Sequence, residues 1–351
     1  MNFKFYLRKI KSTDLSRFND TAKQISQING KPWRIVLLDI YWCALIYGSG
    51  HVDYKEYEMY TMNHKKRKGV LTEKKNNILV KKYTDFDYAI YYINKAILYK
   101  KFEKLLKRDW IVLGENTVVA KPNGTSLKEE DIPKGVNLEG FKEFIKDKED
   151  IIVKPLDLSC GKGVEKIHIK DWDPTKLFDY LLSNHQYLAE EVVVQCDEMC
   201  KLSNASVNTV RIMTILDNGK VHAVGGCVRM GTGNNVVDNF NHDGISACLD
   251  VKTGKIMTYG YDKKRNIYHE VPGKGTKIEG FQIPCWNEII DFVKEGSLIV
   301  PEVKYLGWDL CVSKDKGIVM IECNHYPGHD CAQYPKLNLG TYDAIMEALK
   351  E

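Results

Sequence analysis

After residue 110 the chain consists of short apolar segments of strand length, separated by turn-rich stretches and by a few segments with helical spacing. The apolar segments favour β-strands because Gly, Pro, Asn and Asp clusters bound them. The amphipathic stretches have the 3.6-residue spacing of helices. This mixture predicts an α+β fold built on antiparallel sheets. Strands are expected at residues 151–155, 164–169, 206–216, 220–230, 308–312 and 317–322, and helices at 138–146, 176–184 and 289–295.

The first 110 residues have a different pattern, which predicts a basic and mostly helical region. Apolar residues recur at helical spacing between residues 35 and 45, and again from 88 to 106, where they predict one long helix. Residues 1–110 contain 23 Lys and Arg against 11 Asp and Glu, whereas residues 111–351 contain 28 against 36. The net charge of +4 therefore hides a basic first third and an acidic remainder.

Composition excludes several protein classes. A chain of 351 residues with 44% hydrophobic residues can bury a large core and form about two to three domains. The longest apolar run, residues 35–47, contains Asp39 and is too short to span a bilayer. The N-terminus has no uninterrupted apolar run typical of a secretory signal. The ten cysteines lack a framework spacing, so we expect reduced thiols and a cytoplasmic location.

The first candidate site is a lysine followed by a glycine-containing loop. Lys154 ends an apolar strand, and Ser159, Gly161 and Gly163 lie in the loop before the next strand. A lysine ammonium can bind a phosphate oxygen, and glycines let backbone N–H groups approach an anion closely. The loop is not a Walker A motif, because no Gly-Lys-Ser/Thr opens a helix. An ordinary β-hairpin with turn glycines is an equally good interpretation of this segment alone.

The second candidate site is a set of oxygen ligands near the C-terminus. Asp309 lies in one expected strand, Glu322 ends another, and Asn324 follows two residues later. Residues two apart in an extended chain point to the same side. Two carboxylates and an amide oxygen suit Mg²⁺ when phosphates and water complete its coordination. Taken alone, a strand-end Glu followed by a turn Asn explains the same residues.

Together, these two sites in this order resemble the ATP-grasp superfamily over about residues 90–335. Between them lies an apolar strand broken by Glu190 and Glu191, similar to the superfamily's adenine-binding hinge. The stretches 206–212, 227–231 and 307–309 are similar to those of the sugar-transfer-associated, teichuronopeptide-biosynthesis-like group. The resemblance implies a fold of two α+β subdomains that grip ATP, preceded here by the mostly helical region. The implied domains are residues 1–110, 111–189 and 190–351.

The resemblance also implies roles for individual residues. For Lys95, a solvated lysine on a basic helix face is as good an interpretation as the implied phosphate role. Asp197 and Glu198 are both candidates to bind the ribose. The implied set is Lys95 and Lys154 for the ATP phosphates, Ser159, Gly161 and Gly163 for the phosphate loop, Glu190, Glu191 and Val193 for the adenine hinge, and Asp309, Glu322 and Asn324 for Mg²⁺.

Two arginines in the middle of expected strands complete the implied site. Arg211 and Arg229 are flanked by apolar residues, and a strand arginine that points to solvent is the simpler interpretation. The resemblance makes them catalytic groups that hold the γ-phosphate or an oxyanion. Many ATP-grasp ligases place an arginine just before the metal-binding aspartate, but this chain has Lys304 in that stretch. Either Lys304 or Arg229 alone is expected to take that role.

The implied activity is that of an ATP-dependent carboxylate–amine ligase that uses ATP and Mg²⁺ and proceeds through an acylphosphate. The expected substrates are a small or polysaccharide-linked carboxylate and an amine, in cell-surface polysaccharide or peptide-conjugate synthesis. One alternative is an ATP-grasp kinase that phosphorylates a sugar or another small-molecule hydroxyl. Another is a non-enzymatic basic helical module that binds an anionic polymer, a membrane surface or nucleic acid, because tyrosines are interleaved with the basic residues of the first 110. A solvated helical face is the simpler interpretation of that region. Nucleic acid is not an expected partner.

Overall fold

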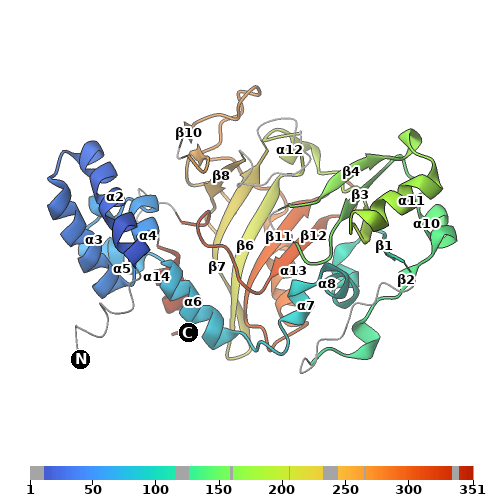
Figure 1. Ribbon diagram of the computed structural model, residues 1–351, viewed down its shortest axis with the longest axis horizontal. Helices are drawn as coiled ribbons and strands as arrows, with labels where there is room; N and C mark the ends of the chain where they lie inside the picture. The colour runs from blue at the N-terminus through green and yellow to red at the C-terminus, as the bar shows by residue number, and fades with distance from the viewer. Residues whose placement is uncertain are drawn as a thin grey trace. The chain divides into compact units, whose positions relative to one another are not determined.

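The computed structural model describes residues 12–114, 126–158, 161–204, 206–231, 244–264, 266–333 and 340–350, with side chains from residue 16 onward. The chain divides into two compact units (Figure 1). Unit 1 comprises Met1–Lys82 and Gln333–Glu351, and unit 2 comprises Tyr83–Ala332. Among the described helices, none has both the length and the apolar composition needed to cross a bilayer. The domain boundaries expected at residues 110 and 189 stay a prediction.

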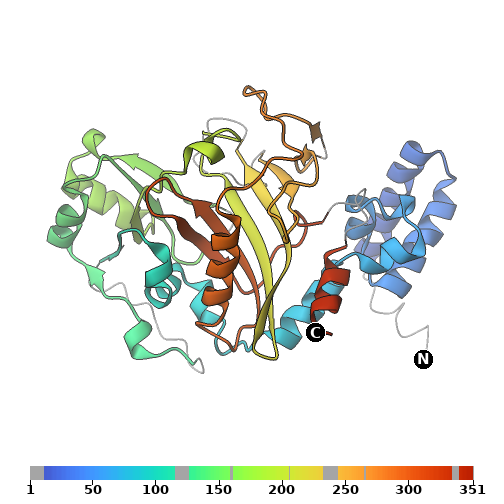
Figure 2. The same ribbon diagram turned by 180° about the vertical axis from the view of Figure 1, so that it is seen from behind.

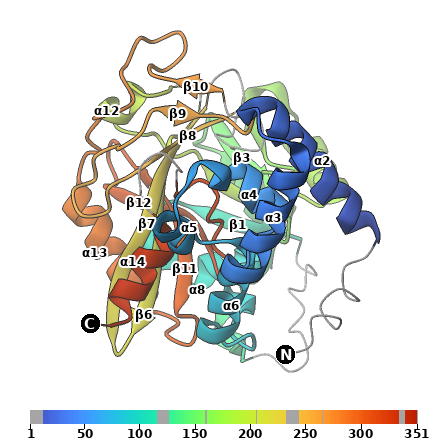
Figure 3. The ribbon, with the colours of Figure 1, turned by 90° about the vertical axis from the view of Figure 1, so that its left-hand side faces the viewer.

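Unit 1 is helical, as its sequence pattern indicates. Figure 3 shows α2 and α3 side by side, and their apolar faces form a core that includes Ala22, Ile25, Val36 and Ile40. The C-terminal helix belongs to this unit, where α14 lies beside α5 and Nζ of Lys75 lies 4.2 Å from the centre of the Tyr342 ring. The Gln333 side chain also exchanges two hydrogen bonds with the Leu71 backbone. The helices are α2 (Ser12–Asn29), α3 (Trp33–Tyr47), α4 (His51–Glu56), η1 (Met59–Thr61), α5 (His64–Gly69), α6 (Glu73–Tyr83) and α14 (Thr341–Ala348).

Unit 2 begins with three short helices, where the sequence pattern predicted one long helix. That prediction is wrong because Asn94 adopts an extended conformation and its side chain accepts hydrogen bonds from the N–H groups of Ala96 and Ile97. This is an N-cap, which starts a new helix. The resulting helices are α7 (Ile90–Ile93), α8 (Lys95–Lys101) and α9 (Glu103–Leu106). Lys95 therefore lies at a helix start.

The first sheet of unit 2 has the order β2-β1-β5-β3-β4. Only the pairing of β1 with β2 is parallel among these strands. Helices α10 and α11 cover one face of this sheet (Figure 1), where Phe141, Leu177 and Leu181 pack against Ile151 and Val153. The elements are β1 (Trp110–Leu113), η2 (Glu129–Asp131), β2 (Gly135–Val136), α10 (Leu138–Ile145), β3 (Asp150–Lys154), β4 (Glu165–His168), η3 (Ile169–Asp171), α11 (Pro174–Ser183) and β5 (Leu188–Glu191).

The second sheet of unit 2 has the order β10-β9-β8-β7-β6-β11-β12, and all its pairings are antiparallel. Figure 2 shows α13 against one face of this sheet, where Phe292 packs edge-on against Trp308. The expected α+β class is confirmed. The elements are α12 (Asp197–Cys200), β6 (Thr209–Asp217), β7 (Lys220–Met230), β8 (Ile245–Cys248), β9 (Gly260–Tyr261), β10 (Ile267–Tyr268), α13 (Trp286–Ser297), β11 (Tyr305–Val312) and β12 (Ile318–Asn324).

Candidate functional site

A buried cluster of charges surrounds Lys154 at the end of β3. Its Nζ lies 2.5 Å from Oε1 of Glu190 on the neighbouring strand β5 and 3.0 Å from the hydroxyl of Tyr99. Arg108 contacts the other oxygen of Glu190 through Nε at 3.1 Å and Nη2 at 2.9 Å. The Tyr99 hydroxyl donates to that same oxygen at 2.6 Å. One carboxylate therefore holds two cations and a phenol in place.

Burial and pairing act in opposite directions on these groups. Burial raises the pKa of Glu190, but Arg108 and Lys154 outweigh it and lower the pKa to about 2. Burial lowers the pKa of Lys154, and the Glu190 carboxylate reverses this and raises it above its usual value. Both groups stay charged in the folded protein at neutral pH. Because two cations share one carboxylate, the cluster carries a surplus of one positive charge.

The loop after β3 brings Lys95 towards the same region. Its backbone N–H donates to the Leu156 carbonyl oxygen at 2.8 Å, and its Nζ donates to the Leu158 carbonyl oxygen. Nζ also lies 3.7 Å from Oε1 of Glu322, and the Lys95 side chain is only 14% exposed. Burial lowers the pKa of Lys95, and Glu322 offsets only part of this. These contacts disfavour the interpretation of Lys95 as a solvated lysine on a helix face.

The glycine loop itself is partly described. Gly161 and Gly163 have φ values of +72° and +70°, a conformation that favours glycine. A side chain at Gly163 would lie 2.8 Å from Cγ of Pro155, so the chain passes close to the end of β3. Both glycines therefore fit a tight turn after Lys154. Ser159 lies outside the described residues.

The register of the second sheet aligns the proposed metal ligands and Arg211. Asp309 is paired with Glu322 on β12 and with Arg211 on β6, and Asn324 is paired with Gly307. Directly opposed residues share a face, so one row of side chains crosses three strands. Asp309 is buried, and its oxygens lie 2.5 and 2.6 Å from Nε and Nη2 of Arg211. Nη2 of Arg229 lies 2.8 Å from the same carboxylate.

The two arginines decide the charge state of Asp309. Burial raises the pKa of Asp309, but Arg211 and then Arg229 outweigh it, so the pKa lies below its usual value. This second cluster again has two cations around one carboxylate and carries a surplus positive charge. The side chain of Arg211 is 8% exposed, so the interpretation of Arg211 as a strand arginine pointing to solvent is wrong. Arg229 is 17% exposed and contacts the same carboxylate.

Glu322 and Asn324 supply oxygen ligands of the kind that Mg²⁺ prefers, whereas both oxygens of the third proposed ligand, Asp309, are held by Arg211. Among the described residues, no three His, Cys, Asp or Glu side chains gather closely enough to hold a metal by themselves. Glu322 is 30% exposed and lies in register with Asp309, with Asn324 two residues further on. Oxygen ligands of this kind suit Mg²⁺, which keeps open positions for phosphate and water. Their roles stay a prediction.

The hinge residues lie where β5 leaves the sheet. The Glu190 carboxylate points into the Lys154 cluster, so only the backbone of Glu190 is left to contact the adenine base. Glu191 contacts Lys316 at 2.6 Å and accepts from the Asp109 N–H at 3.2 Å. Val193 is half-buried just beyond. The contact of these residues with adenine stays a prediction, as does the choice between Asp197 and Glu198 for the ribose.

Two parts of the site differ from what sequence patterns indicate. Sequence patterns do not identify Tyr99 and Arg108, because nothing in a single sequence pairs them with a glutamate that lies 91 and 82 residues away.

Lys304 is exposed and lies five residues before Asp309, about 16 Å away along an extended strand. This separation disfavours Lys304 as the replacement for the missing arginine. Arg211 and Arg229 are the guanidinium groups at Asp309.

Comparison with known proteins identifies one family. The family described as sugar-transfer associated ATP-grasp matches residues 93–337. A comparison with curated proteins found no match. Similar solved structures include D-alanyl-alanine synthetase A from Vibrio cholerae O1 biovar eltor, with 10% identity over 74% of this chain and 65% of that chain, at a TM-score of 0.39.

Two further structures are comparably distant. A D-cycloserine synthetase has 9% identity over 74% of this chain and 71% of that chain, at a TM-score of 0.40. A D-alanine–D-alanine ligase from Bacillus anthracis has 16% identity over 73% and 65%, at a TM-score of 0.36. The chain thus spans 65% of the length of the Vibrio cholerae and Bacillus anthracis proteins. The family match carries the assignment, and these distant likenesses add no argument to it.

Arg108→Met should destabilise the protein by about 3–5 kcal/mol, because it leaves a buried carboxylate with one cation fewer. Urea unfolding measures this change. Lys142→Met is the matched control, since Lys142 and Glu139 form an ion pair at the surface, with side chains 40% and 77% exposed. That control should cost less than about 1 kcal/mol. Equal effects of the two substitutions would contradict the structural role of Arg108.

The low pKa of Glu190 predicts a specific loss of stability in acid. The Glu190 carboxyl has a pKa of about 2 in the folded state, against an ordinary value of 4.5. Its ionised form therefore stabilises the fold fully above pH 4.5. That contribution is lost as the pH falls from about 4.5 towards 2. Between pH 6 and pH 3 the unfolding free energy of the wild type should fall by about 2 kcal/mol more than that of Glu190→Gln. Parallel pH profiles would contradict the shift.

Proposed function

Because the chain belongs to the sugar-transfer-associated ATP-grasp family, we propose that unit 2 binds ATP with Mg²⁺ and joins a carboxylate to an amine. The observation that carries the proposal is the excess of cations over carboxylates at the two clusters and the Lys95–Glu322 pair. Five cationic side chains contact three carboxylates there, a net surplus of two positive charges. A triphosphate supplies the opposite charge, and low local polarity strengthens that attraction.

The proposed roles follow from the contacts. Lys95 and Lys154 bind phosphate oxygens, and the backbone of Gly161 and Gly163 approaches them closely. The hinge at Glu190, Glu191 and Val193 binds the adenine. Asp309, Glu322 and Asn324 hold Mg²⁺, which supplies Lewis-acid neutralisation of the phosphate charge when bound. Arg211 and Arg229 then face the transferred phosphoryl group and the oxyanion of the acyl intermediate.

The proposed chemistry has two transfers. The carboxylate oxygen of the first substrate attacks the γ-phosphorus, the bond between that phosphorus and the β–γ bridging oxygen breaks, and ADP leaves. The amine then attacks the carbonyl carbon of the acylphosphate, phosphate leaves, and the amine loses a proton. Positioning and charge neutralisation by the lysines and arginines are sufficient for both steps, so no side-chain nucleophile is needed.

An ATP-grasp kinase remains the second proposal, because the same cationic site would serve transfer to a hydroxyl. The products distinguish the two. Purified protein with ATP, Mg²⁺, uronic acids and amino acids should form ADP and phosphate only when both a carboxylate and an amine are present, with an amide detected by mass spectrometry. A stable phosphate ester formed with a hydroxyl acceptor alone would replace the ligase by the kinase.

Glu322→Gln should lower kcat by at least about 100-fold without weakening nucleotide binding, because it removes a proposed metal ligand but no phosphate-binding cation. Product formation and binding of a fluorescent ATP analogue measure the two quantities. Glu139→Gln, at an exposed glutamate on α10, is the control. Unchanged kcat in Glu322→Gln would remove Glu322 from the metal site.

For the acceptor, we propose that the basic run on α5 contacts an anionic substrate. Arg67 does not take part, because Nη1 and Nη2 lie 2.7 and 2.8 Å from the Asp39 carboxylate. Lys65 and Lys68 are exposed. Lys65→Glu/Lys68→Glu should raise the apparent KM for an anionic polymer acceptor and leave ATP binding unchanged.

The control for this charge reversal is Lys176→Glu, at an exposed lysine of α11. Lys176→Glu should leave both the apparent KM for the polymer acceptor and ATP binding unchanged. If Lys65→Glu/Lys68→Glu does the same, the basic run is ordinary solvated surface.

A further inference from the structure

Helix α3 exposes a row of large apolar side chains in unit 1. The exposed fractions are 56% for Ile35, 69% for Leu38, 55% for Trp42, 61% for Leu45 and 47% for Ile46. With about 100° of rotation per residue, these five positions span an arc of roughly 100° along the helix. We call this arc the α3 stripe. Monomeric proteins rarely expose contiguous apolar surface of this kind unless it binds a partner or a membrane.

The stripe is not part of the core of the unit. The buried side chains of α3 are Val36, Ile40, Cys43 and Tyr47, which lie on the opposite side of the helix and pack in the unit 1 core. Helix α3 therefore has two apolar faces, and among the described residues of unit 1 only one of them packs in the core. The stripe residues are not among the side chains that form this core, so their apolar character needs another explanation.

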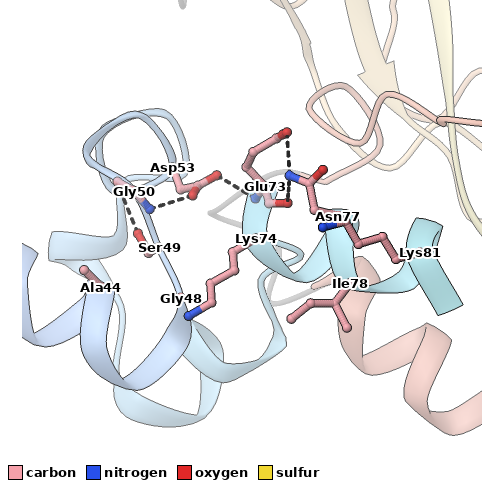
Figure 4. A pocket seen from close by; sticks show the side chains of 10 residues that line it. All are labelled: Ala44, Gly48, Ser49, Gly50, Asp53, Glu73, Lys74, Asn77, Ile78 and Lys81. Carbon is pink, nitrogen blue, oxygen red and sulfur yellow. Dashed lines mark hydrogen bonds between the residues drawn. The ribbon is translucent and has the colours of Figure 1, made fainter. Parts of the chain in front are cut away.

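Helix α6 also exposes an apolar residue between two lysines. Ile78 is 56% exposed. It lines a pocket of about 610 Å³ together with Ala44 and Gly48 at the C-terminal end of α3 and with Lys74 and Lys81 (Figure 4). Lys74 and Lys81 are seven residues apart and so lie on one side of α6. The pocket thus places two lysines beside the C-terminal end of α3.

The charge around the stripe is positive. Lys31 and Arg34 are exposed at the N-terminal end of α3, and Lys74 and Lys81 lie near its C-terminal end. Asp39 is paired with Arg67, but Asp53 and Glu73 line the same pocket as Lys74 and Lys81 and accept the printed hydrogen bonds from uncharged groups. The positive excess therefore rests on Lys31 and Arg34 and on the composition of the region. Residues 12–82 contain 13 Lys and Arg against seven Asp and Glu.

We propose that the α3 stripe binds the surface of a membrane that contains anionic lipids, with α3 lying in the plane of the interface. A basic amphipathic surface with Leu, Ile and Trp on its apolar side inserts at the boundary between headgroups and acyl chains. Trp42 suits that boundary, and lysines at its edge attract anionic headgroups. No described helix is able to cross the bilayer, which agrees with surface binding.

A second copy of the chain is a poorer occupant of the stripe. A two-fold dimer pairs the same patch on both subunits, so it would bring the two lysine-rich edges together. Repulsion between these like charges opposes such a dimer, whereas an anionic lipid surface neutralises them. The inference concerns unit 1 and does not depend on the proposed activity of unit 2.

The test is binding of the full chain to vesicles. Vesicles of phosphatidylcholine with 30% phosphatidylglycerol should sediment the wild type with an affinity at least tenfold higher than vesicles of phosphatidylcholine alone. Leu38→Ser/Leu45→Ser should weaken binding to the anionic vesicles at least tenfold. Leu298→Ser is the matched control, since Leu298 is 53% exposed in unit 2 and should bind as the wild type does. Lys74→Glu/Lys81→Glu should weaken binding and reduce its dependence on salt.

Thermal unfolding and binding of a fluorescent ATP analogue should be unchanged in both double variants, because the substituted side chains are exposed. The proposal is overturned if the wild type does not bind anionic vesicles, or if the Leu38→Ser/Leu45→Ser variant binds them as well as the wild type. It is also overturned if light scattering shows a wild-type dimer that this variant converts to a monomer while neither protein binds lipid. That last result would assign the stripe to a second copy of the chain.

Discussion

The contact on which unit 2 depends is the buried bridge from Arg108 through Glu190 to Lys154. A buried carboxylate is stable only when cations and hydrogen bonds replace its lost hydration, and Glu190 has both. Arg108 also donates to the Met320 carbonyl oxygen on β12 at 2.5 Å, so one guanidinium connects the first sheet to the second. The same side chains, Arg108 and Glu190, therefore hold Lys154 in position and connect the two sheets.

The cluster at Asp309 repeats this arrangement on the second sheet. A single carboxylate again lies between two cations, and again the cations outweigh the burial that would otherwise favour its protonated form. A protein that needed these groups only for stability could replace them with apolar side chains at little cost. Two buried clusters, each with one cation too many, are better explained by an anionic ligand that completes their charge. The charges of the two clusters thus favour the same class of ligand as the family does.

Sequence patterns could predict the strand-borne residues, because the end of an apolar strand is visible in a single chain. Lys154 and Glu322 are expected at the ends of apolar strands and Asp309 within one, and the register places Asp309 opposite Glu322. Their roles stay predictions. Tyr99 and Arg108 could not be identified, since their partner lies more than 80 residues away and no local pattern encodes the contact. The apolar spacing of residues 88–106 predicted one helix, but the local hydrogen bonds of Asn94 end one helix and start another. The place of the C-terminal helix in unit 1 rests on its contacts with α5 and on that of Lys75 with Tyr342, which are equally long-range.

The basic character of the first 110 residues has two separate physical origins. Residues 83–110 contain six Lys and Arg against four Asp and Glu, and two of these cations, Lys95 and Arg108, are buried in contacts with Glu322 and Glu190. Most of the excess lies in residues 1–82, with 17 against seven, and the exposed members of this set include Lys31, Arg34, Lys74 and Lys81. The buried cations act over a few ångströms in a medium of low polarity, so added salt should affect them little. The exposed cations attract an extended anionic surface and are screened within about 8–10 Å at physiological salt. One charge asymmetry in the sequence therefore corresponds to buried cations at the proposed site for a compact anion in unit 2 and to exposed cations at the proposed surface for an extended anionic partner in unit 1.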